Sequence, residues 1–186
     1  MLPTDEQLIA HVMAGEPAAL QPLVERYHGP LLGYLYRLTS GDRPLAEDLV
    51  QDTFEHVLRQ DSFRPGWRFK PWLYAIATHL TYDHFRTPSA RRTTELDDRA
   101  APEHADDAAG PEEQAQAASL ARQVADAIGQ LPAEYRAALL LRYYTGHSLQ
   151  EISAALNIPL GTVKSRLSVG TRRLRQLLIR VETETR

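Results

Sequence analysis

The sequence predicts an all-α protein made of two small helical domains, at residues 1–92 and 119–186, joined by an acidic flexible linker at residues 93–118. On both sides of the linker, apolar residues recur at helical spacing, and no stretch shows the alternation of Val, Ile and Thr that is typical of strands. The linker is rich in Ala, Asp, Glu and Pro. Apart from Leu96 it has no large apolar residue, so it is not expected to pack into a core.

The N-terminal domain is expected to contain four helices, at residues 6–15, 17–39, 43–60 and 69–86. These segments carry apolar residues at helical spacing and are punctuated by Gly and Pro. In the third segment, the residues available for burial are Leu49, Phe54, Val57 and Leu58. In the fourth, Pro71 suits the first helical turn. One apolar stripe of that segment contains Leu73, Ile76, Ala77 and Leu80.

The C-terminal domain is expected to contain four more helices, at residues 119–131, 132–146, 148–157 and 162–181. Ser148 and Glu151 form a capping-box pattern at the start of the third, and Thr162 is the natural N-cap of the fourth. On a helical wheel, the apolar arc of the fourth segment contains Val163, Leu167, Gly170, Leu174, Leu177 and Leu178. Its opposite side carries Lys164, Ser165, Ser168, Arg172 and Arg175.

This pair of helices is typical of a helix-turn-helix whose second helix lies in the DNA major groove. Lys164 and Arg166 are candidates for reading guanine edges, while the later arginines suit phosphate contacts. A helical hairpin with a solvated basic face is the alternative interpretation.

The net charge of -3 hides an uneven distribution. Basic residues dominate 64–92 and 142–180, and acidic residues dominate 95–113 between them. Two cationic surfaces on either side of an anionic tether indicate a polyanion held at two places, although charge also clusters by chance.

The composition argues against several classes of protein. The absence of cysteine excludes disulfides, thiolate zinc sites and thiol catalysis, and agrees with a reducing compartment. Uninterrupted apolar stretches such as 137–141 are far shorter than the roughly 20 residues of a membrane span. The N-terminus also lacks the layout of a secretory signal. We therefore expect a cytoplasmic protein without membrane insertion. For the chain as a whole we also expect no catalytic residue, cofactor or metal.

A second candidate surface is acidic. Helical spacing puts Asp48, Gln51, Asp52 and Glu55 on one face of the segment 43–60, opposite its apolar residues. Most acidic faces are simply solvated, but aligned acids with a Gln between them also suit a basic or polar partner helix. Because this face would repel DNA, a protein partner is the better functional interpretation.

A third candidate surface lies in residues 63–86, where aromatic and basic residues are interleaved. Most of these aromatic residues are expected in the core. The same combination also holds unpaired bases, at roughly 1 to 3 kcal/mol per stacked base. Thr78, His79, Tyr82 and Arg86 are expected on the outer side of the last helix as a nucleic-acid stripe.

With these segments identified, the chain resembles the extracytoplasmic-function (ECF) group of bacterial RNA polymerase sigma factors. "AEDLVQDTFEHVLR" resembles the family helix that docks on the polymerase clamp, and "FRPGWRFKPWLYAIATHLTYDHFR" resembles the segment that opens and reads the -10 element. "LPAEYRAALLLRYYTGHSLQEISAALNIPLGTVKSRL" resembles the -35-binding domain. The three motifs occur in family order and cover nearly the whole chain apart from the linker.

The resemblance implies a transcription initiation factor without catalytic chemistry of its own. It would bring core RNA polymerase to promoter DNA, recognise the -35 and -10 elements and help to melt the duplex. The acidic linker would thread through the polymerase toward its RNA exit path. Many family members are held inactive by an anti-sigma factor, so such a protein is a further expected partner.

The resemblance also assigns roles by position. The acidic face with Asp48, Gln51, Asp52 and Glu55 would contact the clamp helices of the largest polymerase subunit. Residues for the -35 major groove and its phosphates would be Lys164, Ser165, Arg166, Ser168, Arg172 and Arg175. Residues for -10 recognition and melting would be Arg64, Trp67, Lys70, Trp72, His79, Tyr82 and Arg86.

Two departures from the family pattern stand out. The family usually has Asn where this chain has His79, which puts the preferred -10 base in question. Many members read Arg-Ala-Arg where this chain has Val169, Gly170 and Thr171, so Arg172, Arg173 and Arg175 are candidates to replace the missing contacts.

Two alternatives compete with this interpretation. A helix-turn-helix repressor or activator acting alone as a dimer would use the same second helix, but it leaves the N-terminal domain unexplained. An enzyme would use His79 and Asp83, four residues apart, as metal ligands with His84 nearby. Such helical pairs are common by accident, and two ligands do not make a catalytic site.

Overall fold

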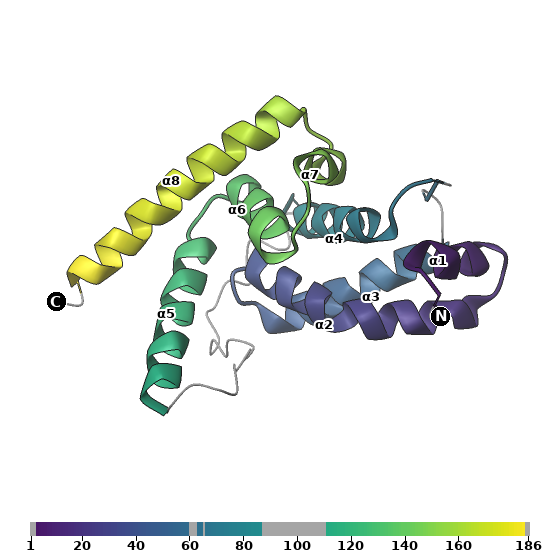
Figure 1. Cartoon of the computed structure of the whole chain (residues 1–186), viewed down its shortest axis with the longest axis horizontal. Helices are drawn as coiled ribbons and strands as arrows, with labels where there is room; N and C mark the ends of the chain where they lie inside the picture. The colour runs from purple at the N-terminus through teal and green to yellow at the C-terminus, as the bar shows by residue number, and fades with distance from the viewer. Residues whose placement is uncertain (1–2, 60–62, 65, 87–110, 185–186) are drawn as a thin grey trace.

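A computed structural model of the chain describes residues 3–59, 63–64, 66–86 and 111–184. Throughout these residues the regular secondary structure is helical, and no strand is present in them. The predicted all-α class with two helical domains is confirmed. We call residues 3–86 the N-terminal half and residues 111–184 the C-terminal half (Figure 1).

The N-terminal half contains the four predicted helices and one short extra turn. The helices are α1 (Asp5–Met13), α2 (Gln21–Leu38), α3 (Arg43–Arg59) and α4 (Phe69–Arg86), and the 3-10 turn η1 (Pro17–Leu20) precedes α2. Thr4 caps α1 through a capping box with Gln7. After α2 the chain reverses through Ser40 and Gly41, which have φ of 62° and 95°. That reversal brings α3 back against α2.

The C-terminal half contains α5 (Pro111–Gly129), α6 (Ala133–Leu139), the π-helical turn η3 (Leu140–Tyr144), α7 (Leu149–Leu156) and α8 (Leu160–Glu184). The capping box of Ser148 and Glu151 is present at the start of α7. Asn157 ends α7 in the left-handed conformation, with φ of 51°. The chain therefore turns at once, and α8 begins at Leu160 rather than after the predicted N-cap Thr162.

The predicted linker 93–118 differs from the structure at its end. Its residues up to 110 lie outside the described residues, whereas the backbone from Pro111 onward belongs to α5. Proline suits the first helical turn, two glutamates follow it, and Ala and Gln are good helix formers. The low hydrophobicity of residues 111–118 therefore indicated a linker, although the helix propensity of the same residues is high.

One hydrophobic cluster runs through both halves. It joins Leu23 and Leu35 of α2 with Leu73 of α4, Ile152 of α7 and Val163 of α8. Helix α4 contacts α2 and α3 on one side and α7 on the other (Figure 1). The helix that carries most of the predicted -10 residues thus lies at the contact between the two halves.

Candidate nucleic-acid and protein interfaces

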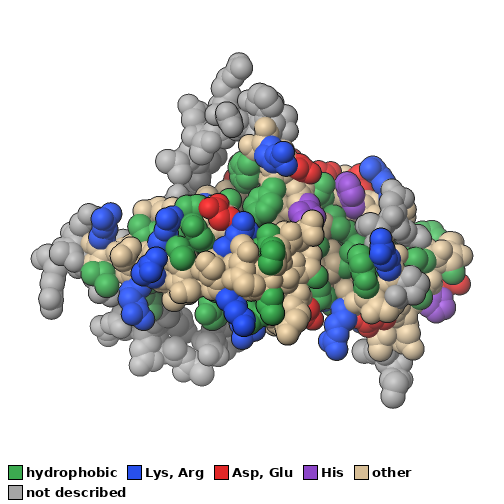
Figure 2. Space-filling view, turned by 90° about the horizontal axis from the view of Figure 1, so that it is seen from above, with side chains coloured by type: hydrophobic (Ala, Val, Ile, Leu, Met, Phe, Trp, Pro, Cys, Tyr) green, Lys and Arg blue, Asp and Glu red, His purple; other side chains and the backbone are tan. Residues whose placement is uncertain are grey.

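Helix α8 presents its basic side to solvent. Val163 is fully buried, and a Cβ on Gly170 would lie 3.1 Å from Leu139 Cδ1 of α6, so the apolar side of α8 packs tightly on the domain. The exposed side carries Lys164, Ser165, Ser168, Arg172 and Arg175, as predicted, while Arg166 is half-buried. Figure 2 shows Lys and Arg side chains spaced along this part of the surface.

The start of α7, the first helix of the helix-turn-helix, is fixed locally. The Ser148 backbone N–H donates to Glu151 Oε2 at 2.8 Å, and the Glu151 N–H donates to Ser148 Oγ at 3.2 Å. The hydrogen bond from the Ser148 backbone N–H to the carboxylate is the largest cause that lowers the pKa of Glu151, and burial opposes it. The two hydrogen bonds together form the capping box that starts α7.

The departure from the family pattern at residues 169–171 is explained in part by packing. Gly170 is buried against α6, where a larger side chain would press on Leu139 and Tyr135. The Arg173 guanidinium lies 4.8 Å from the ring centre of Tyr135. Arg173 is therefore engaged in its own domain, which leaves Arg172 and Arg175 as the stronger candidates for replacing the missing basic contacts.

The loop before α4 forms a pocket with α1. It has a volume of about 580 Å³ and is lined by Glu6, Ala10, Met13, Phe63, Gly66, Trp67 and Arg68. Trp67 is 45% exposed, and the Arg64 guanidinium lies 5.6 Å from its ring centre. An exposed indole and neighbouring cations beside a cavity are the groups that hold an unstacked base.

Two predicted nucleic-acid residues lie in the core instead: Trp72, which was assigned to -10 recognition, and Thr78, which was expected on the outer stripe of α4. Trp72 is 6% exposed, and its ring meets Phe63 edge-on with centroids 4.8 Å apart. Thr78 is fully buried, where it shares a 2.7 Å hydrogen bond with the Tyr34 hydroxyl. Because α4 is packed by helices on several sides, a single apolar stripe underestimates how much of it is buried. Neither side chain is accessible to DNA in this arrangement.

The remaining predicted -10 residues of α4 are divided between solvent and the C-terminal half. His79 and Arg86 are exposed. Lys70 Nζ donates to the Thr145 carbonyl oxygen at 2.6 Å, and the Tyr82 hydroxyl donates to the Ala133 carbonyl oxygen at 3.4 Å. Burial raises the pKa of Tyr82 to about 12, against the opposing effect of Arg166 of α8. One predicted -35 residue thus lies close enough to influence a predicted -10 residue.

The polar face of α3 is exposed as predicted. Asp48, Gln51 and Asp52 face solvent, and Gln51 Nε2 donates to Glu55 Oε1 at 3.0 Å. Leu58, which was expected in the core, is 44% exposed. It lies one turn beyond Glu55 and therefore borders the polar face. The helical spacing of Gln51, Glu55 and Leu58 was the signal from which its exposure could have been predicted.

The part of the chain that the structure describes contains neither a metal site nor a helix that could span a membrane. In that part, no three His, Cys, Asp or Glu side chains come together to hold a metal ion. Each helix found there is too short or too polar to cross a bilayer.

Two family models and several known proteins match this chain. The family model "Sigma-70 region 2" matches residues 23–92, and "Sigma-70, region 4" matches residues 121–174. The chain is 35% identical to ECF RNA polymerase sigma factor SigE of Mycolicibacterium smegmatis, covering 98% of this chain and 72% of that protein. It is 34% identical to the ECF RNA polymerase sigma-E factor of Haemophilus influenzae, covering 88% and 89%.

A solved structure has a similar fold. It is the sigma factor RpoE in complex with the anti-sigma factor NepR from Bartonella quintana, with a TM-score of 0.65 and 26% identity. The match covers 86% of this chain and 96% of that one.

Proposed function

This chain belongs to the ECF group of RNA polymerase sigma factors, and we propose that its three candidate surfaces divide the contacts of promoter recognition between them. The observation that carries the proposal is the basic outer side of α8, presented by a capped helix-turn-helix. In this function α8 enters the -35 major groove, with Lys164 and Arg166 toward base edges and Arg172 and Arg175 toward phosphates.

The -10 element is assigned to the loop before α4 and the exposed part of α4. Arg64, Trp67, His79 and Arg86 are accessible for it, and the pocket beside Trp67 is a place for one flipped base. Lys70 and Tyr82 belong to the same surface but are engaged by the C-terminal half. Trp72 is better described as a core residue that supports the loop.

Core RNA polymerase is assigned to the polar face of α3. Asp48, Gln51, Asp52 and Glu55 supply acceptors for a basic or polar partner helix, and Leu58 adds an apolar contact at their edge. Interfaces gain most of their affinity from a few buried contacts ringed by polar ones. The clamp helices of the largest subunit are the proposed partner.

An anti-sigma factor is a further proposed partner. The support is the solved structure with a similar fold, which is that of a sigma factor in complex with an anti-sigma factor and whose match covers 86% of this chain. A repressor or activator that acts alone as a dimer is not favoured, since the named relatives over most of the chain are RNA polymerase sigma factors.

The test is transcription in vitro from genomic DNA fragments by core RNA polymerase, with and without this protein. We expect promoter-specific transcripts only in its presence. The Lys164→Ala variant removes a major-groove contact, which is worth about 1 to 3 kcal/mol in a good pair, so transcription should fall about tenfold.

Arg180→Ala is the matched control for this variant. It removes one positive charge from an exposed position of the same helix, about 24 Å further along at 1.5 Å per residue. It should leave transcription unchanged. A genomic survey without any promoter-specific transcript would contradict the proposed function.

A further inference from the structure

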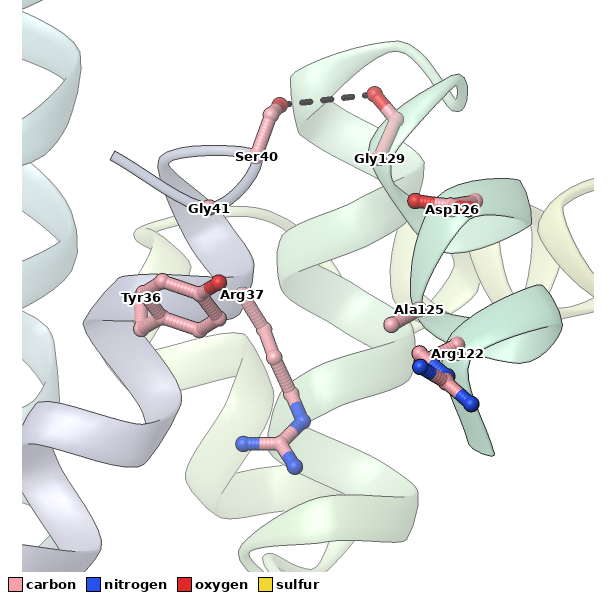
Figure 3. Close-up of a pocket in the computed structure, with 8 residues that line it drawn as sticks. All are labelled: Tyr36, Arg37, Ser40, Gly41, Arg122, Ala125, Asp126 and Gly129. Carbon is pink, nitrogen blue, oxygen red and sulfur yellow. Dashed lines mark hydrogen bonds between the residues drawn. The ribbon is translucent and has the colours of Figure 1, made fainter. Parts of the chain in front are cut away.

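The contact between the two halves combines the shared hydrophobic cluster with a group of buried polar contacts. We call it the seam and define it by Leu38, Ser40, Lys70 and Tyr74 on the N-terminal side and by Gly129, Arg136, Thr145 and His147 on the C-terminal side. Figure 3 shows one end of it, where Ser40 Oγ donates to the Gly129 carbonyl oxygen at 3.4 Å beside a small cavity between α2 and α5.

Arg136 joins the two sides of the seam. Its guanidinium donates across the seam to the Leu38 carbonyl oxygen at 2.7 Å and to Ser40 Oγ. Within its own half it donates to the carbonyl oxygens of Gly129 and Leu131, at 2.6 and 2.8 Å. All four acceptors are neutral, although the side chain is almost fully buried. Burial lowers the pKa of Arg136, because the charged form has lost its water.

His147 and Lys70 form the other end of the seam. The His147 ring packs edge-on against Tyr74 of α4, with centroids 5.1 Å apart, and its Nδ1 lies 2.6 Å from Thr145 Oγ1. Lys70 Nζ reaches across to the Thr145 carbonyl oxygen. Among the described residues, the buried side-chain nitrogens and oxygens left without a hydrogen-bond partner are Arg136 Nε and His147 Nε2. Both of them lie at the seam.

This arrangement suits a reversible contact. Burying a positive charge without a negative partner is costly, and so is each buried nitrogen without a hydrogen-bond partner. Both costs disappear when the seam opens to water. The seam also covers functional surface, because it engages Lys70, and the adjoining contact with Ala133 holds Tyr82.

We propose that the seam is an autoinhibitory contact: while it is closed the -10 surface is partly covered by the C-terminal half, and the chain must part along the seam to bind promoter DNA. This inference rests on the -10 assignment in the proposed function. It adds that the free protein has a closed state, held by Arg136 and by the Lys70–Thr145 and Tyr74–His147 contacts.

The chain offers a direct way to lock the seam. It contains no cysteine, so an introduced pair has no competing thiol. A Cβ on Gly129 would lie 3.7 Å from the Ser40 Cβ, within the range of about 3.5 to 4.5 Å that disulfides span. The test is the Ser40→Cys/Gly129→Cys double variant, assayed with core polymerase on a genomic fragment that the wild-type protein transcribes.

We expect the double variant to cross-link on oxidation, to lose promoter-specific transcription while cross-linked, and to regain it when dithiothreitol reduces the disulfide. The Ser40→Cys and Gly129→Cys single variants, oxidised in the same way, control for the substitutions and should stay active.

Each other outcome has a definite meaning. A fully cross-linked protein that transcribes as well as its reduced form would overturn the autoinhibitory contact. Failure to cross-link would overturn the closed state itself. If the wild-type and reduced proteins produce no promoter-specific transcript, the proposed function fails, and that result is independent of the cross-linking yield.

Discussion

His147 is held neutral by its position at the seam. The residue is 2% exposed, and burial, assisted by the nearby Lys70 and opposed by Glu151, lowers its pKa to about 4. The unfolded chain has an ordinary histidine at this position and binds a proton at higher pH than the folded protein does. The stabilising effect of neutral His147 is therefore complete above about pH 6.5 and is lost as the pH falls toward 4.

We predict a corresponding loss of stability in mild acid. Between pH 7 and pH 5, this single group should lower the free energy of unfolding by about 2 kcal/mol, at about 1.4 kcal/mol per pKa unit. Urea unfolding at the two pH values, followed by circular dichroism, measures it. In the His147→Gln variant the difference between the two pH values should shrink by that amount, whereas His79→Gln, at an exposed histidine of α4, should leave it unchanged.

Gly33 of helix α2 is explained by its contact with another element, η3. Gly33 is buried in the helix interior, where glycine costs about 1 kcal/mol relative to alanine. A Cβ at this position would overlap the Tyr144 hydroxyl and lie 3.3 Å from its Cζ. The Tyr144 ring is also held by Arg37, whose guanidinium is 4.3 Å from the ring centre. Gly33 thus permits η3 to approach α2.

Gly33→Ala should consequently weaken the closed state while favouring the helix itself. In the double-cysteine background we expect slower cross-linking between positions 40 and 129, measured by non-reducing electrophoresis over time. Adding Tyr144→Phe removes the overlapping hydroxyl, so cross-linking should recover in the Gly33→Ala/Tyr144→Phe protein. Unchanged cross-linking in Gly33→Ala would show that the Tyr144 contact does not help to close the seam.

In the molecule as a whole, one buried cluster continues through both halves. We therefore expect the wild-type protein to unfold in one cooperative transition, with the halves losing structure together. The chain has two tryptophans, Trp67 and Trp72, and both lie in the N-terminal half. Tryptophan fluorescence consequently reports on that half alone, while circular dichroism at helical wavelengths reports on both.

We predict that Arg136→Met separates the two signals. The substitution keeps most of the aliphatic stem but removes the donors that join Leu38 and Ser40 to the C-terminal half. In thermal unfolding, the fluorescence and dichroism midpoints should coincide in the wild type and differ in this variant. Arg122→Met, at an exposed arginine of α5 near the same seam, is the control and should keep them coincident. Coincident midpoints in Arg136→Met would mean that apolar packing alone couples the halves.

The features that the sequence determined by itself are local ones. Helical periodicity gave the four N-terminal helices, and the Ser148–Glu151 pattern gave the start of α7. Helical periodicity also predicted the exposed side of α8 and the acidic side of α3, because each of these helices packs mainly through one side. Such patterns depend on residues three or four positions apart, which any helix brings together.

Only the tertiary structure decided what depends on partners distant in sequence. Trp72 and Thr78 are buried because α4 is packed on several sides, whereas Leu58 is exposed because no described element covers the end of its face. The seam could not be read from the sequence at all, since Arg136 bonds to Leu38 and Lys70 to Thr145 across long stretches of chain. Periodicity assigns a face to each helix, but which faces meet is settled by the packing of the whole molecule.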